Sequence, residues 1–314
     1  MNLHNDREAF HDLSVLAAEN IGIPVMAVKR DYYIVMMLQK LAGSEYADRS
    51  VFKGGTSLSK CYPGSIMRFS EDIDLTYIPD DNTSKKQYDK ALKGIEKVMS
   101  SGAHIQKIPE ERNDRNKSSF VWFDDEDKEE TKVKLEIGSS IRPDPYELRE
   151  LKTYIQEYLE AHEMDAVARE YELKAVYINT LGIERTFLDK VMSVKRHAIC
   201  GTLEKKVRHI YDVTVLFDRP DIQEFLSRHD ELKELLRKTK QTDSFYLEKR
   251  NVSAEYDPVG IYDFPTWEKY FDAGIRSRYE TLHEDLLYTN EKQEFSRAID
   301  AFRKISQLFA EIGE

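Results

Sequence analysis

The segment Val51–Tyr77 restricts the fold of this chain more than any other stretch of its sequence. It begins with Val51–Lys53, which has the composition of a short strand. Gly54–Gly55 follows at once, and paired glycines allow the backbone to turn sharply and to approach another group closely. Across Asp72–Tyr77, polar and apolar residues alternate, which predicts a second strand with one polar face. The segment therefore predicts two strands joined through a glycine turn and a short helix that starts near Thr56.

The glycine turn has the composition of an anion site. Backbone amides at the start of a helix carry partial positive charge, and we expect them to bind phosphate groups together with the hydroxyl of Ser57. The polar face of the second strand carries Asp72 and Asp74, which point to the same side because one residue separates them. Two carboxylates so close repel each other unless a cation lies between them, and Mg²⁺ prefers such oxygen ligands.

The pair of aspartates alone is not specific. Many such pairs lie on solvated strand faces, and glycosyltransferases use one to hold a metal-bound sugar nucleotide. The glycine turn favours a different interpretation, because a phosphate cradle and a metal clamp complement each other. Together they predict a site for a nucleoside triphosphate (NTP).

The pattern along the chain changes after Pro143–Pro145. Before it, strands and helices alternate, and after Ile183 helical patterns dominate. We therefore predict an α/β part over residues 1–145, a connecting region over 146–180 and a helical part over 181–314. Within the first part the patterns predict helices over 7–20, from Pro24 and over 84–101, and strands over 104–108, 118–123 and 131–138.

Composition excludes several classes of protein. The 47 basic and 58 acidic residues give a formal net charge of −11, which argues against a protein that coats DNA through its overall charge. Cys61 and Cys200 are far apart and form no metal-binding spacing, as in reduced cytosolic proteins. The longest nearly apolar stretch, 32–41, is well short of the roughly 20 residues of a membrane helix. With no apolar leader at the start, the sequence predicts a cytoplasmic protein without a membrane partner.

Two motif blocks resemble those of the AbiEii/AbiGii nucleotidyltransferase toxins. These are Phe52–Lys60, with Gly-Gly-Thr-Ser at its centre, and Arg68–Leu75, with Ser-Glu-Asp-Ile-Asp. Glu184–Lys190 is similar to the lysine motif of this family, and Tyr211–Asp212 to its aspartate motif. The family belongs to the DNA polymerase β-type nucleotidyltransferase superfamily, and MenT-type toxins are relatives. The resemblance implies a nucleotidyltransferase α/β domain with a mixed sheet, followed by a helical domain that carries the lysine and aspartate motifs.

The resemblance also implies the chemistry, which is Mg²⁺-dependent transfer of a nucleoside monophosphate from an NTP to an acceptor hydroxyl. Asp72 and Asp74 would hold the metal, and Lys190 would neutralise the leaving pyrophosphate. Asp212 would orient Lys190 or the base. The residues that would surround the phosphates are Gly54, Gly55, Thr56, Ser57, Lys60, Arg68 and Ser70.

Several of these residues have a structural alternative. Lys190 borders the apolar stripe of its predicted helix, where it needs an anion, either a triphosphate or a structural carboxylate. Asp212 has the spacing to pair with Arg208 on one helix face. Lys60 and Arg68 are as well explained as surface charges.

Glu136 is the candidate third carboxylate. In this superfamily a neighbouring strand often provides a carboxylate that binds the catalytic metal and helps to deprotonate the attacking hydroxyl. Glu136 lies on a strand of the right kind, but it shares its face with Lys132 and Lys134, so a surface ion pair is the alternative.

Residues 184–209 carry an excess of positive charge, with seven basic against three acidic residues. Such a patch would hold a nucleic-acid backbone, whereas ordinary solvated charges on two helices are the alternative. The basic residues are Arg185, Lys190, Lys195, Arg196, Lys205, Lys206 and Arg208.

The acceptor and the partners follow from the resemblance alone. MenT-type relatives add nucleotides to the 3′ end of tRNA, which stops translation. AbiEii-type relatives act in abortive infection and are paired with an antitoxin. The resemblance thus implies a toxin of a toxin–antitoxin system that modifies tRNA. The alternatives are transfer to a protein or a small molecule, and a non-catalytic nucleotide-binding scaffold.

Overall fold

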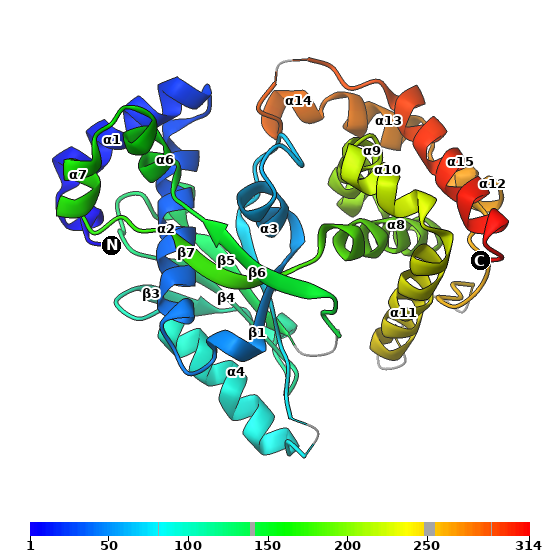
Figure 1. Ribbon diagram of the computed structural model, residues 1–314, viewed down its shortest axis with the longest axis horizontal. Helices are drawn as coiled ribbons and strands as arrows, with labels where there is room; N and C mark the ends of the chain where they lie inside the picture. Colours follow the sequence, from blue (N-terminus) through cyan, green and yellow to red (C-terminus); the bar gives the residue numbers. More distant parts are fainter. Residues whose placement is uncertain (81, 139–141, 248–254, 290) are drawn as a thin grey trace. The chain divides into compact units, whose positions relative to one another are not determined.

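The chain folds into two compact units, which together contain a mixed α/β part and a helical part (Figure 1). The computed structural model describes residues 1–80, 82–138, 142–247, 255–289 and 291–314. The α/β unit comprises Met1–Cys61 and Phe69–Leu181, and the helical unit comprises Tyr62–Arg68 and Gly182–Glu314. The expected class, a mixed-sheet α/β fold followed by a helical region, is confirmed.

The centre of the α/β unit is a mixed sheet with the strand order β3-β4-β5-β2-β1-β7-β6. The pairs β2–β5 and β1–β7 are parallel, and the other neighbours are antiparallel. The strands are β1 (Ser50–Lys53), β2 (Asp72–Tyr77), β3 (His104–Lys107), β4 (Asn116–Trp122), β5 (Val133–Gly138), β6 (Tyr146–Leu151) and β7 (Val176–Leu181). The first five agree with the predicted strands to within a few residues.

Helices cover the apolar side of this sheet, and the local sequence explains where they start. Pro24 precedes the first turn of α2, and Ser84 caps α4 in a capping box with Gln87. The helices of this unit are α1 (Arg7–Ile21), α2 (Val25–Ala42), α3 (Gly54–Cys61), α4 (Lys85–Met99), α5 (Lys128–Thr131), α6 (Tyr154–Ala161) and α7 (Asp165–Glu170). Short 3-10 helices lie at Leu3–Asn5, Ala47–Arg49 and Pro109–Glu111.

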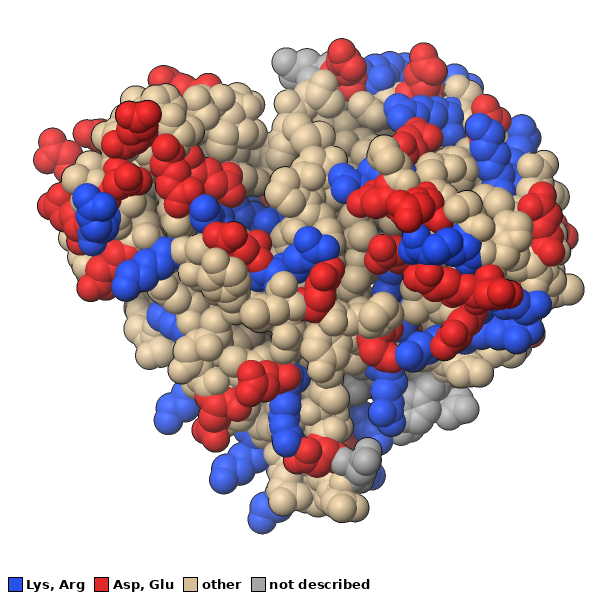
Figure 2. Space-filling view, in the orientation of Figure 1, with Lys and Arg blue, Asp and Glu red and all other residues tan. Residues whose placement is uncertain are grey.

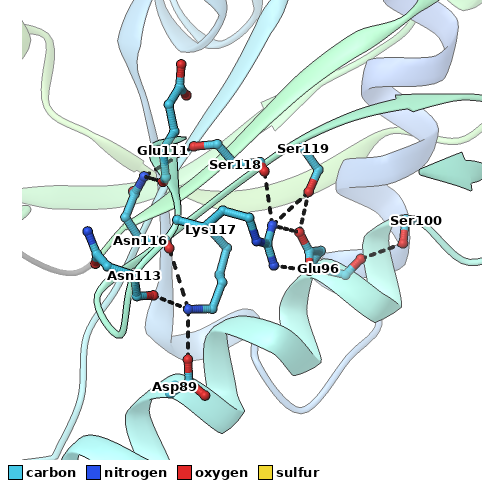
Figure 3. Close-up of polar contacts among 10 residues, drawn as sticks. Asp89, Glu96, Ser100, Glu111, Asn113, Asn116, Lys117, Ser118 and Ser119 are labelled. Atoms are coloured by element: carbon cyan, nitrogen blue, oxygen red, sulfur yellow. Dashed lines mark hydrogen bonds and ion pairs between the residues drawn. The ribbon is translucent and has the colours of Figure 1, made fainter. Parts of the chain in front are cut away.

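The contacts of α4 show which face of the sheet is covered (Figure 3). Lys117 and Ser119 of β4 have buried, apolar register partners on β5. They bind Asp89 and Glu96 of α4, with 2.7 Å between Lys117 Nζ and Asp89 Oδ1. Because side chains alternate along a strand, the aspartate pair of β2 points to the opposite face.

Residues 146–180, which we expected to form a connecting region, contribute strands β6 and β7 to the sheet. β6 pairs with β7 over its full length, and among the described residues it has no second partner strand. Most of its side chains are exposed on both faces, so its sequence has no continuous apolar face that would indicate a strand. The segment therefore belongs to the α/β unit.

The helical unit is built around α8 (Ile183–Ile199) and α9 (Val207–Phe217), which pack against each other. The short segment Tyr62–Arg68, which links α3 to β2 along the chain, belongs to this unit. It forms a bridge between Arg68 and Leu287, and Tyr288 N donates to Met67 O at 2.9 Å. The other helices are α10 (Pro220–Ser227), α11 (His229–Leu247), α12 (Phe264–Trp267), α13 (Ala273–Glu280), α14 (Leu282–Asp285) and α15 (Phe295–Glu311), with 3-10 helices at Leu203–Lys206 and Glu268–Tyr270.

Candidate active site

The glycine turn and the aspartate pair are in direct contact. β1 ends at Lys53, and Gly54 has a φ of +88°, in the left-handed region that favours glycine. A Cβ on Gly54 would lie 2.3 Å from Oδ2 of Asp74, so that the Asp74 carboxylate would have to move. Two features therefore favour glycine at position 54: its left-handed backbone conformation, and the space that the Asp74 carboxylate occupies beside it.

The hydroxyls of the turn face inward. Ser57 is fully buried, and its Oγ donates to Gly54 O at 2.9 Å. Thr56 Oγ1 lies 2.9 Å from Ser70 Oγ and also bonds the carbonyl of Asp72. The Ser57 hydroxyl, which we expected to face a phosphate together with the helix amides, instead binds the carbonyl three residues earlier. Thr56 and Ser70 instead tie the start of α3 to the start of β2.

Strand register places four charged side chains together on the face of the sheet opposite to α4, which we call the open face. Asp72 of β2 is opposite Lys134 of β5, and Asp74 is opposite Glu136. All four are half-buried. Lys53 of β1 is the register partner of Asp74 on its other side. The carboxylates of this face therefore have lysines as neighbours within the sheet.

Glu136 makes the ion pair that the sequence allowed. Its Oε1 lies 2.6 Å from Lys134 Nζ, whereas Lys132 pairs with Glu129. Among the described residues, no three His, Cys, Asp or Glu side chains are arranged to hold a metal ion. The carboxylates of Asp72 and Asp74 are oxygen donors of the kind that a hard divalent cation prefers, and such a cation takes phosphate oxygens and water as its further ligands. The donor chemistry of this pair fits Mg²⁺.

Lys60 is not a surface charge. It lies in the last turn of α3, its side chain is 3% exposed, and its Nζ is 2.8 Å from Oδ1 of Asp31. It also lies 3.8 Å from the ring centre of Tyr154, whose backbone N donates to Asp31 Oδ2. Burial raises the pKa of Asp31, and Lys60 opposes that rise. The pair anchors the far end of α3, and sequence reasoning missed Asp31 because the two residues lie on different elements.

Arg30 is a second residue that sequence reasoning missed. Its guanidinium pairs with Glu71, directly before the aspartate pair, and donates to the carbonyl of Glu130. Helix α2 thus binds both the loop before β2 and the connection before β5. In the sequence, residues 29–33 resemble the helix that precedes the motif in the AbiEii group, and this resemblance, which singles out no individual residue, is a signal that could have pointed to Arg30.

Arg68, Lys190 and Asp212 form a buried cluster within the helical unit. Asp212 is fully buried and accepts from Arg68 Nε at 2.6 Å and from Arg68 Nη2 at 2.7 Å. Lys190 Nζ lies 2.7 Å from Asp212 Oδ2. Burial alone would raise the pKa of Asp212, but the two cations outweigh it and lower the pKa to about 2. The pairing of Asp212 with Arg208 and the surface position of Arg68 are therefore both wrong.

The excess of positive charge over residues 184–209 does not form one basic surface. Arg185, Lys190 and Lys195 are buried, and Arg185 pairs with Asp189 at 2.9 Å. Lys195 donates to the carbonyl of Ile261, and burial lowers its pKa to about 8. Arg196 pairs with Asp243. On the face drawn in Figure 2, basic and acidic side chains of the helical unit are intermixed. Within this stretch the exposed basic side chains are Lys205 and Arg208.

The fold and the paired motifs define a nucleotidyltransferase-type protein, and comparisons with known proteins agree. The structure is similar to that of MenT4, a nucleotidyltransferase toxin from Mycobacterium tuberculosis H37Rv, with a TM-score of 0.51 and 19% sequence identity over 95% of this chain and 98% of that chain. At this identity the likeness shows the fold. A search of the curated proteins found no match.

The sequence matches the family described as nucleotidyl transferase AbiEii toxin, type IV toxin–antitoxin (TA) system, over residues 37–305. The chain belongs to this family of toxins. A toxin of such a system has an antitoxin as its partner, and a nucleotidyltransferase takes an NTP as substrate. In the described ranges, none of the helices is long and apolar enough to span a membrane.

The contact between Gly54 and Asp74 leads to a prediction. We expect Gly54→Ala to lower nucleotidyl transfer about a hundredfold, because the added methyl group displaces the Asp74 carboxylate. Gly22→Ala is the matched control, since Gly22 also has a positive φ, +80°, but has open space around it. Transfer rates of both variants, with circular dichroism to verify folding, measure the effect. Equal losses in the two variants would attribute the effect to backbone strain alone.

Proposed function

We propose that this toxin transfers a nucleoside monophosphate from an NTP to the 3′ end of tRNA and depends on Mg²⁺. The observation that carries this proposal is the contact of the glycine turn with the aspartate pair, which brings a phosphate cradle and two carboxylates together. Membership of the AbiEii family supports the transfer chemistry. The acceptor rests on the resemblance to MenT-type toxins.

The residues of the α/β unit have separate tasks in this reaction. Asp72 and Asp74 would hold Mg²⁺, which when bound aligns the α-phosphate and neutralises charge on the leaving group. The backbone of Gly54–Gly55 would face the β- and γ-phosphates. Thr56 and Ser70 keep the turn and the aspartates in register with each other. Glu136 would assist at the attacking hydroxyl.

Lys190 of the helical unit would neutralise the leaving pyrophosphate. Asp212 holds the ammonium group of Lys190 and the guanidinium of Arg68 at the same time. We therefore assign Asp212 as a positioning residue for Lys190, and Arg68 as the residue that fixes the segment leading into the aspartate motif. In this assignment neither Asp212 nor Arg68 touches the substrate.

A labelling assay tests the proposal. Purified protein is incubated with total tRNA, Mg²⁺ and each α-labelled NTP in turn, and Asp72→Asn/Asp74→Asn serves as the inactive control. We expect label on tRNA with at least one NTP, no label with the double variant, and no label when the metal is removed with a chelator. The active NTP identifies the preferred nucleotide.

Other outcomes distinguish the alternatives. Label on a protein or a small molecule, but none on tRNA, would overturn the proposed acceptor and leave the transfer chemistry in place. No label on any acceptor in a cell extract would overturn the transfer itself. A non-catalytic scaffold would then be the better interpretation, and Asp72→Asn would leave any toxicity to cells unchanged.

A further inference from the structure

Lys134 lies between two carboxylates on the open face of the sheet. Its Nζ is 2.6 Å from Oε1 of Glu136 and lies 3.0 and 2.8 Å from Oε1 and Oε2 of Glu111. Across the parallel pairing of β2 with β5, Lys134 is directly opposite Asp72. One ammonium group thus stands beside the aspartate pair and is shared by two acids from different elements.

Glu111 is held in place from both sides (Figure 3). Its carbonyl accepts from Asn116 Nδ2 at 2.7 Å, and Glu111 ends the 3-10 helix Pro109–Glu111. The next residue, Arg112, donates to both carboxylate oxygens of Glu96 on α4 and to the carbonyl of Ser118 at 3.0 Å. The backbone at Glu111 is therefore fixed at a place from which its carboxylate reaches Lys134.

With two acids nearby, Lys134 can lose its contact with one carboxylate and still keep its contact with the other. The Lys134 side chain is 22% exposed, so its ammonium group needs an anion nearby. With Glu111 in place, Lys134 keeps a counter-ion when it separates from Glu136. Without Glu111, the lysine would have to stay on Glu136 and would keep that carboxylate from any other cation.

We propose that Lys134 is a positioning residue that holds Glu136 and releases it to a divalent cation bound at Asp72 and Asp74, while Glu111 retains the lysine. This inference rests on the proposed function, because it requires a cation at the aspartate pair. It explains why Glu136 is the register neighbour of Asp74 and yet is paired with a lysine. Lys134 and Glu111 thereby set the affinity of the site for the metal.

Binding of Mn²⁺ alone, a spectroscopic substitute for Mg²⁺, tests this role without any measurement of activity. Electron paramagnetic resonance of free Mn²⁺ gives the Kd of the full chain. We expect Lys134→Met to bind Mn²⁺ about fivefold more tightly, because a competing cation is removed. We expect Glu111→Gln to bind about fivefold more weakly, because Lys134 then loses the anion that would hold it away from Glu136. If Lys134→Met does not fold, Glu111→Gln carries the test alone.

Two controls isolate the mechanism. Lys132→Met removes the same charge two positions earlier, where the lysine pairs with the exposed Glu129, and should change the Kd less than about twofold. In a Glu136→Gln background, Lys134→Met should no longer tighten binding. A gain that persists in this background would show general electrostatics and would overturn the proposed release of Glu136.

The failures of the two proposals are distinguishable. If the wild-type protein binds no Mn²⁺, or binds it equally well after Asp72→Asn, the proposed metal site is wrong and this inference is wrong with it. If Asp72→Asn abolishes binding but Lys134→Met and Glu111→Gln leave the Kd unchanged, the metal site stands. In that case Lys134 and Glu111 form an ordinary ion pair.

Discussion

Asparagine at either Asp72 or Asp74 should lower nucleotidyl transfer more than about a thousandfold while the protein stays folded. The substitution keeps the size and one carbonyl oxygen of the side chain but removes the negative charge on which a metal site of two carboxylates depends. Both side chains are half-buried on the open face of the sheet, and like charges so close repel each other. Stability should therefore change little, because the loss of this repulsion and the loss of attraction to the neighbouring lysines, Lys53 and Lys134, oppose each other.

Rates of transfer and urea unfolding of the two variants measure this. Asp80→Asn is the matched control, because Asp80 follows the same strand but pairs with Arg49 at the surface. Its transfer rate should match that of the wild-type protein. Equal losses in the two variants would contradict a site in which only one aspartate binds the metal. A single variant that keeps its activity would contradict the two-carboxylate site.

The sequence predicted the central strands and helices because their signals are local. In β5, buried and half-buried side chains alternate strictly, and α4 carries its own cap at Ser84. β6 gave no such signal, since an edge strand with most side chains exposed need not alternate. β6 is identified by its pairing with β7, and a short stretch of sequence does not show with which other segment a strand will pair.

The motif turn was predicted correctly in position, but the partners of its charged residues were not. Lys60 binds Asp31 on α2, and Arg68 binds Asp212, which lies 144 positions later in the chain. Spacing within one helix suggested Arg208 for Asp212, because only i, i+4 neighbours are visible in a sequence. A buried carboxylate that collects two cations needs the tertiary fold.

Several basic residues of 184–209 likewise have tertiary partners that the sequence does not show. Formal charges were added as if every side chain reached the solvent, whereas Arg185 and Lys190 are neutralised inside the unit by Asp189 and Asp212. Burial, which sequence periodicity gives only approximately, determines whether a basic residue can meet a nucleic acid. This stretch therefore gives no support to a nucleic-acid acceptor.

The cluster around Asp212 gives the largest expected effect on stability. Asp212→Asn should lower the free energy of unfolding by about 3–5 kcal/mol, because the buried Arg68 and Lys190 would lose the carboxylate that they share. Glu224→Gln is the control within the same unit, since it breaks an exposed pair with Arg228 and should cost less than about 1 kcal/mol. Urea unfolding at neutral pH compares the three proteins.

The pH dependence of stability distinguishes the contribution of the Asp212 charge from the contribution of the packing of its side chain. Its pKa is lowered from 3.8 to about 2 in the folded protein, so its contribution is fully present well above 3.8 and is lost as the pH falls through 3.8 toward 2. That loss amounts to about 2 kcal/mol. Because Asp212→Asn has no such group, the stability gap between the wild type and this variant should narrow as the pH falls from 5 to about 3. A gap that stays constant over this range would show that packing of the side chain, and not its charge, stabilises the cluster.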